Sequence, residues 1–407
     1  MERPAHDQLE VGVSYRPAAV GPYLWQEFNA EVVTRDLTAI AARRIPTIRV
    51  GLSWDAFMPS DRAPSPRRMR DLETLLAAAR ELGLRVVPTL FAQSIGNCVM
   101  LPAYAIDRRF RRPGVRCITD ARVADGGPRD IYADPLMLEV QVRWLDALLA
   151  AFAHHPAIAA WDLGHDPAST VRPRRIAEMA AWAALLAERV HAQDEQCRLT
   201  LGQADVVRGR GVRLAAVAAH VDAIGLVLNP QELALPGDVL DAGRAVFVAD
   251  LGRLLAGPDV PIMVDVEVAS GELERDGDDA VPVDPLTLPP DVARALCDEL
   301  LQRLSTSGVA GILAGAWSDW GERLLESPPA DRRPWLARLG IIDSTGNSKP
   351  VADAWDALVA KERAVAVPAA FPVAVDVESY YSNLPDSLHD LHVSWQGDRG
   401  DAPAILT

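Results

Sequence analysis

Short apolar runs alternate with longer segments of helical spacing along most of this 407-residue chain. Short continuous runs are typical of strands covered on both faces, and the longer segments are typical of amphipathic helices. The predicted strands cover residues 11–15, 47–52, 85–91, 157–163, 198–201, 222–228, 261–266 and 309–316. The predicted helices cover residues 31–44, 66–82, 135–152, 174–191, 206–219, 239–255, 291–305 and 350–363.

Strands and helices in this alternating order predict an α/β fold, a (β/α)8 TIM barrel with a parallel sheet. We expect the barrel to occupy residues 1–364. Residues 365–407 contain an apolar segment, two adjacent tyrosines and a last periodic piece that ends at Trp395. We expect them to form a short C-terminal extension that packs on the barrel.

The stretch that bears most on function is AIAAWDLGHDP, residues 157–167. Its apolar part predicts a buried strand that ends near Gly164 and leaves His165 and Asp166 at its carboxyl end. In a TIM barrel that end of the strands is the catalytic face. We therefore expect His165 and Asp166 to lie in the candidate site.

A long segment over residues 92–134, rich in Arg, Gly and Pro, follows the third predicted strand. Loops of this length in compact domains are often functional, and the position after a strand places this one over the catalytic face. We expect it to form the mouth of the barrel together with Trp54, Asp166 and Trp317.

Composition indicates which classes of partner and which cellular location to expect. The net charge of −15 argues against nucleic acid and anionic membranes. The first residues have no apolar signal core and no stretch reaches transmembrane length, so a cytoplasmic protein is expected. The four cysteines form no CxxC pair and read as isolated thiols, although a bridge between Cys98 and Cys117 stays open. No metal spacing or phosphate loop occurs, so neither a metal nor another cofactor is expected.

Five blocks of sequence in order carry a resemblance to known enzymes. They are IRVGLSWDAFMPS, RDIYADPLMLEVQVRWLDALLAAFAHHPAIAAWDLGHDP, VPIMVDVEVAS, GAWSDW and LARLGIIDSTGNSKP. Between about residues 11 and 361 the chain resembles the retaining glycoside hydrolases of clan A, in particular the family 5 cellulases and β-mannanases. The resemblance implies a TIM barrel, a carbohydrate or glycoside ligand and catalysis by two carboxyl groups.

The acid/base position departs from the family's pattern. The fourth strand of the family ends in Trp-x-x-x-Asn-Glu-Pro, and the matching residues here are Trp161, His165, Asp166 and Pro167. Asp166 is shorter than glutamate by one C–C bond, about 1.5 Å, and a misplaced carboxyl group lowers the rate steeply. As a catalytic residue Asp166 would be the acid; as a structural residue it would cap the helix that follows.

The nucleophile position is also displaced. The family's glutamate follows the seventh strand, and the family's count of five residues from Pro261 reaches Val266, with Asp265 and Glu267 on either side. We expect that only a one-residue register shift or a β-bulge would bring Glu267 into the mouth, and VPIMVDVEV has no glycine that favours a bulge. The nucleophile is therefore Asp265, Glu267 or absent, and an ion pair or cap at the strand end is the structural alternative.

Seven further residues are candidates for substrate binding. Arg49 and Trp317 occupy positions that the resemblance assigns to the family's site, and the other tryptophans could stack on sugar rings. Each also has a structural alternative. The arginine could form an ion pair inside the barrel, and the tryptophans could be buried. The two amides could cap loops, and the histidine could be a hydrogen-bonded loop residue. The seven are Arg49, Trp54, Gln93, His165, Asn229, Trp317 and Trp320.

Two functions are compatible with this sequence. The altered catalytic positions favour a glycoside hydrolase-like barrel that keeps a carbohydrate-sized cleft with hydrolysis weak or lost. The alternative is an active retaining O-glycosyl hydrolase that acts on a β-linked glycan or glycoside through Asp166 and Glu267.

Overall fold

The structure is a computed structural model that describes residues 8–398, apart from 92, 210, 272, 277–278, 283, 362, 369–370 and 372–374. Within residues 273–282 and at residue 398 it describes the backbone alone.

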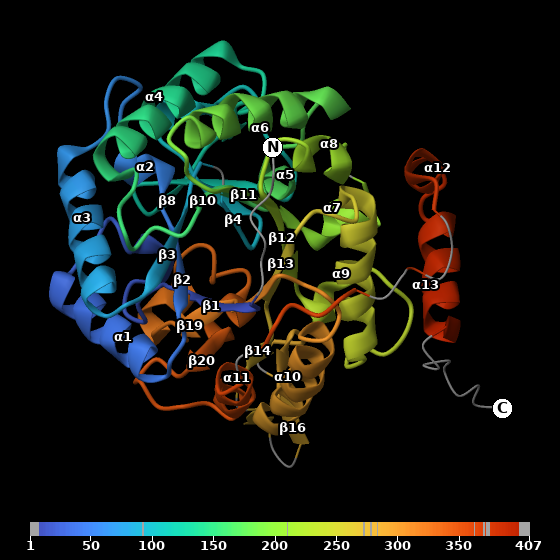
Figure 1. Cartoon of the computed structure of the whole chain (residues 1–407). Coiled ribbons are helices and arrows are strands. Elements are labelled where there is room, and N and C mark those ends of the chain that lie inside the picture. The colour runs from blue at the N-terminus through green and yellow to red at the C-terminus, as the bar shows by residue number, and fades with distance from the viewer. Residues whose placement is uncertain are drawn as a thin grey trace.

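Eight parallel strands close into a barrel, and helices surround it (Figure 1). In chain order each strand pairs with the next, and the first pairs with the last, so the predicted (β/α)8 barrel is confirmed. The strands are β1 (Glu10–Ser14), β2 (Thr47–Gly51), β3 (Arg85–Thr89), β10 (Trp161–His165), β11 (Cys197–Gly202), β12 (Ala223–Leu228), β13 (Ile262–Val266) and β18 (Gly311–Ala314).

The outer helices lie close to the predicted bounds because apolar residues on one face of each pack against the barrel. The principal ones are α1 (Ala30–Ala42), α3 (Pro66–Glu81), α4 (Pro135–Phe152), α6 (Ile176–His191), α9 (Ala242–Ala256), α10 (Pro290–Leu304) and α11 (Val351–Val359).

The single helix predicted over 206–219 is wrong. The segment instead holds two short helices, α7 (Gln203–Val207) and α8 (Leu214–Ala218). Gly209 and Gly211 between them have φ values of 63° and 84°, a left-handed backbone that a continuous helix does not contain.

The predicted bounds of the fourth strand are also wrong. Residues 157–163 were expected, whereas β10 begins at Trp161 and includes His165. Ile158 makes only an isolated bridge to Val86, and the pairing of β10 with β11 shifts register between Asp162 and His165. Residues 157–160 therefore precede the strand, and the strand itself is the later part of the run together with His165.

The long segment after β3 contains short strands. Six of them form two small sheets at the mouth end of the barrel: β4 (Ser94–Ile95), β5 (Cys98–Met100), β7 (Arg116–Thr119) and β8 (Arg122–Ala124) in one, β6 (Ile106–Asp107) and β9 (Gly127–Pro128) in the other.

The cysteines of this segment are free thiols. Cys98 pairs with Arg116 and Val99 pairs with Cys117, so Cys98 and Cys117 project to opposite faces of the small sheet. The bridge that the sequence left open is therefore not formed.

Two C-terminal helices, α12 (Val377–Ser382) and α13 (Asp386–Asp398), lie beside α9 (Figure 1). The Tyr380 hydroxyl donates to the Val206 carbonyl oxygen at 2.9 Å. The Trp395 indole, 2% exposed, donates to Asp250 Oδ2 at 3.0 Å. These contacts attach the helices to the α7–α9 side of the barrel.

Candidate active site

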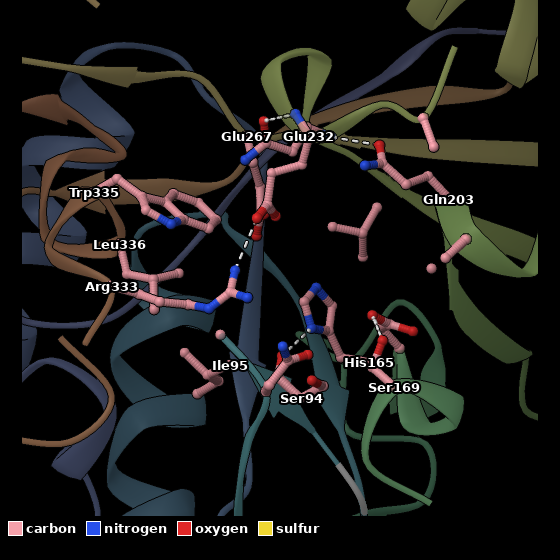
Figure 2. A pocket seen from close by; sticks show the side chains of 18 of the residues that line it. Ser94, Ile95, His165, Ser169, Gln203, Glu232, Glu267, Arg333, Trp335 and Leu336 are labelled. Carbon is pink, nitrogen blue, oxygen red and sulfur yellow. Dashed lines mark hydrogen bonds and ion pairs between the residues drawn. The ribbon is translucent and has the colours of Figure 1, made fainter. Parts of the chain in front are cut away.

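A cavity of about 290 Å³ lies at the carboxyl ends of the strands. Its walls come from residues that follow several different strands, as in other barrels whose sites are built from the loops. Figure 2 shows Glu232 and Glu267 on one side of it, with His165 and Ser169 on the opposite side. Asp166 lines the same cavity, so the structure brings together both carboxyl groups that the sequence suggested.

Glu267 reaches the cavity without a bulge. β13 pairs in unbroken register with β12 and β18, and the Glu267 amide donates to the Leu228 carbonyl oxygen at 2.8 Å. Alternation therefore points Met263, Asp265 and Glu267 to the barrel interior. Val266 points to the opposite face of the strand and packs in the hydrophobic core outside the barrel.

The expectation that Glu267 needs a register shift or a bulge to reach the mouth is therefore wrong. The count from Pro261 selected a residue on the outer face, whereas the inner face ends one residue later, at Glu267. Gly315 provides the space, because a Cβ atom there would lie 3.0 Å from Glu267 Cγ.

Asp265 lies one step deeper on the same face and does not line the cavity. It forms an ion pair with Arg49, and both residues are buried. Arg49 Nη2 also donates to Ser14 Oγ at 2.7 Å. Arg49 thus makes the barrel ion pair that the sequence allowed, and it holds the layer of side chains below Glu267.

The charge state of Glu267 is set by its surroundings. The pKa of Glu267 is raised to about 7, mainly by burial; the Asp265 and Glu232 carboxyl groups add to the increase, and the guanidinium groups of Arg16 and Arg49 oppose it. Arg16 follows β1 and lines the cavity beside Glu267. Near neutral pH the Glu267 carboxyl group therefore exchanges readily between its acid and its ionised form.

Asp166 is held at the turn between β10 and the short helix α5 (Pro167–Thr170). Its φ of 47° and ψ of 49° are left-handed, a conformation that aspartate tolerates better than most residues. Its amide donates to the Thr200 carbonyl oxygen at 2.9 Å, and the Ser169 hydroxyl donates to its carboxylate. A Cβ atom at Gly202 would lie 2.3 Å from Asp166 Oδ1, so the carboxyl group packs directly against that glycine.

His165 is the last residue of β10 and is 4% exposed. Burial, followed by the nearby Arg49 and Arg16 charges, holds the pKa of His165 well below its usual range, so the ring is neutral. Nδ1 lies 3.3 Å from the Ser94 carbonyl oxygen, which assigns the ring hydrogen to Nδ1.

Nε2 of His165 is consequently an acceptor. It lies 3.7 Å from Asp265 Oδ2 and has no hydrogen-bond partner within the described part of the chain. The view in Figure 2 shows this edge of the ring turned toward the cavity, where it can accept a hydrogen from a ligand hydroxyl group.

The two amide candidates have different fates. Asn229 lines the cavity, and its Oδ1 accepts from the Gln231 and Glu232 amides at 3.0 and 3.2 Å. Its buried Nδ2 has no partner among the described residues. Gln93 lies outside this cavity and donates from Nε2 to the carbonyl oxygens of Leu52 and Thr89, so it caps the loop.

The three predicted tryptophans do not line this cavity. Trp54, Trp317 and Trp320 are at most 2% exposed and belong to the core. The expected mouth of Trp54 and Trp317 is therefore wrong, because both rings pack inward. The aromatic wall is Trp335, which lies in the loop between β19 (Ala316–Ser318) and β20 (Gly340–Ile342).

Sequence reasoning also missed an ion pair across the cavity wall. Arg333 Nη1 lies 2.8 Å from Glu232 Oε1 and joins the loop after β19 to the loop after β12. Glu232 and Arg16 lie within a few residues of the ends of β12 and β1, and polar residues at such positions were the available signal. Arg333 lies far along the loop after β19 and had no such signal.

Among the described residues, no group of three or more His, Cys, Asp or Glu is placed to hold a metal ion. Likewise, none of the described helices has the length and apolar character needed to cross a bilayer.

Comparisons with known proteins define the class of fold. No protein-family model matches the sequence, and no curated protein sequence matches it. The structure, however, is similar to glycoside hydrolases of family 5.

One similar structure is a GH5_18 protein from Streptomyces cattleya in complex with Manb1-4GlcNAc, with a TM-score of 0.76 and 18% identity over 96% of this chain and 92% of that chain. A second is a GH5_18 protein from Bifidobacterium longum subsp. infantis, with a TM-score of 0.67 and 17% identity over 88% and 79%. A third is the exo-beta-1,4-mannosidase Op5Man5 from Opitutaceae bacterium strain TAV5, with a TM-score of 0.67 and 17% identity over 88% and 62%. At these identities the likeness establishes the fold, a (β/α)8 barrel like those of the three structures, and fold alone does not define activity.

Proposed function

We propose that this protein is an active retaining β-glycosidase, with β-mannosides as the first substrate class to test. The observation that carries the proposal is that Asp166 and Glu267 line one cavity at the carboxyl ends of the strands. The reaction requires two carboxyl groups that flank the scissile glycosidic bond, about 5–5.5 Å apart in a retaining enzyme. The similar structures supply the substrate class, since one is an exo-beta-1,4-mannosidase and another holds Manb1-4GlcNAc.

In this proposal Glu267 is the nucleophile. Its carboxylate attacks the anomeric carbon and the bond to the leaving group breaks, which forms a covalent glycosyl-enzyme. Asp166 donates its proton to the leaving oxygen, and then removes a proton from the water that releases the sugar.

Two neutral side chains orient the sugar. His165 Nε2 accepts a hydrogen bond from a sugar hydroxyl group, and Asn229 Nδ2 donates one; both atoms are buried polar groups that a ligand would satisfy. Trp335 is 3% exposed and supplies an apolar contact at the cavity wall for the sugar. The cavity volume of about 290 Å³ suits a short end of a glycan rather than a long internal segment.

The test is hydrolysis of 4-nitrophenyl β-mannoside and of mannobiose by the wild-type protein and by Glu267→Gln. We expect the variant to lose roughly 10³-fold or more in kcat, because the amide cannot attack. Glu73→Gln, on the exposed face of α3, is the matched control and should keep full activity. Proton NMR of the first product should show the β-anomer if the mechanism retains configuration.

A second function, glycan binding without cleavage, is favoured by one observation, the short side chain of Asp166. Asp166→Asn separates the two. In an enzyme, turnover of mannobiose should fall by roughly 10²–10⁴-fold, with a smaller loss on the nitrophenyl glycoside, whose leaving group needs little acid. Wild-type protein that binds mannobiose by calorimetry and hydrolyses neither substrate would establish the binding function instead.

A further inference from the structure

A second and larger hollow lies beside the mouth of the barrel. It has a volume of about 1010 Å³ and runs between the segment of β6 and β9 and the residues that follow α5. We call it the arginine groove, because five arginines contribute to its walls. They are Arg109, Arg112, Arg129, Arg172 and Arg174.

The charge of the arginine groove opposes that of the chain. Its five arginines face three aspartates, a formal excess of two positive charges in a protein whose net charge is −15. The aspartates are already engaged. Asp107 accepts from the Arg109 amide at 2.8 Å, Asp134 pairs with Arg129, and Asp130 accepts from the Tyr132 amide at 3.0 Å.

Two of the arginines are available to a ligand. Arg109 and Arg172 are exposed, and neither forms an ion pair with any residue that the structure describes. Arg109 belongs to a segment, residues 108–112, that reads RRFRR. The net charge, from which nucleic acid and anionic membranes were not expected as partners, hides this local concentration.

The groove also offers an exposed aromatic face. Phe110 is 52% exposed and lies among the arginines. An aromatic ring beside guanidinium groups can stack on the C–H face of a sugar while the arginines hold an anionic substituent.

The groove and the cavity lie on either side of α5. Ser169 lines the cavity, and the next residue, Thr170, lines the groove. Arg112 spans the boundary, since it donates to the carbonyl oxygens of Thr170 at 2.5 Å and Ala168 at 3.2 Å. A ligand in the groove would therefore lie next to the helix that Asp166 caps.

We propose that the arginine groove binds an acidic glycan, one that carries carboxylate or sulfate groups. The choice of a glycan rests on the proposed function of the neighbouring cavity, and the choice of an acidic one rests on the groove itself. A long polyanion such as nucleic acid would meet the repulsion of the −15 net charge, whereas a few anionic groups fit a local excess of two.

The test is calorimetric binding of three probes to the full chain: a galacturonate hexamer, a sulfated mannohexaose and unmodified mannohexaose. We expect an acidic hexamer to bind at least tenfold more tightly than the neutral one, with an affinity that falls as salt rises. The paired change Arg109→Gln and Arg172→Gln should remove that advantage. The preference between the carboxylated and the sulfated probe identifies the anionic group.

The matched control is Arg67→Gln with Arg70→Gln, two exposed arginines on α3 that carry the same change of charge. It should alter the affinity less than twofold. Equal binding of neutral and acidic hexamers, equal losses in the two double variants, or tighter binding of a single-stranded oligonucleotide would overturn the proposal. Hydrolysis of nitrophenyl β-mannoside, measured alongside, tests the cavity alone, so failure of either proposal is recognisable separately.

Discussion

Glu267 and Asp166 follow two strands of the same barrel, β13 and β10, and their carboxyl groups reach the cavity by different routes. Glu267 needs only the regular alternation of a strand, and the layer below it is the buried Arg49–Asp265 pair. Asp166 needs a left-handed turn, the Ser169 hydroxyl and a glycine at position 202.

This difference indicates where each side of the site is vulnerable. The β13 side depends on electrostatics within the barrel, so changes there should alter stability and the charge of Glu267. The β10 side depends on local geometry, so small changes there should alter the position of the Asp166 carboxyl group while the barrel remains intact.

The largest effect should come from Asp265→Asn on the β13 side. It leaves the Arg49 guanidinium buried without its ionic partner, and removal of one partner of a buried pair costs about 3–5 kcal/mol. Urea unfolding should show this loss, whereas Glu267→Gln should unfold near the wild-type midpoint. Equal stability of the two variants would contradict the division of roles between Asp265 and Glu267.

On the β10 side, Gly202→Ala should have the next largest effect. Its Cβ atom would lie 2.3 Å from Asp166 Oδ1, so the carboxyl group must move, at a cost of about 1–3 kcal/mol. We expect kcat on mannobiose to fall by more than kcat on nitrophenyl β-mannoside, because only the former needs the acid. Gly321→Ala is the control, since its Cβ would have no neighbour nearer than 3.7 Å and its φ is −65°. A rate loss shared equally by both substrates would point to general disruption.

The same contrast, between regular strands and local turns, explains which parts of the fold and the site the sequence predicts. The barrel strands are predictable because apolar runs on strands such as β12 have a direct physical cause, burial on both faces. Alternation also places Asp265 and Glu267 on one face correctly. What failed was the choice of which face points inward, because that depends on pairing with β12 and β18, and a count from Pro261 does not report it.

The rest of the site depends on contacts between distant segments. A tryptophan in a core and one in a cleft look alike in sequence, so Trp317 was favoured although Trp335 lines the cavity. The left-handed turn at Asp166 and the short strands of the 92–134 segment carry no periodic signal, since two to four residues are too few for one.

The pH dependence of kcat/KM should test the electrostatic control of Glu267 on the β13 side. The nucleophile must be ionised, and the pKa of Glu267 is raised to about 7, so kcat/KM should rise about tenfold between roughly pH 6 and pH 8. Arg16 lowers that pKa, so Arg16→Met should move the rising limb to higher pH. Arg67→Met, on the exposed face of α3, should leave the limb in place. A shift to lower pH would contradict the assigned influence of Arg16.

The smallest effect should come from Ser169→Ala, on the β10 side. The Ser169 hydroxyl donates to the Asp166 carboxylate. Loss of one hydrogen bond to a charged group should make the productive position of this carboxyl group less stable by about 1.5 kcal/mol. Because Asp166 also has its backbone held by Thr200, the carboxyl group should remain near the cavity and turnover of mannobiose should fall only about tenfold. The nitrophenyl substrate should be nearly unaffected, and Ser169→Thr, which keeps a hydroxyl group, should recover most of the rate. If Ser169→Ala slowed both substrates equally, or if threonine gave no recovery, Ser169 would be a packing residue and the turn alone would position Asp166.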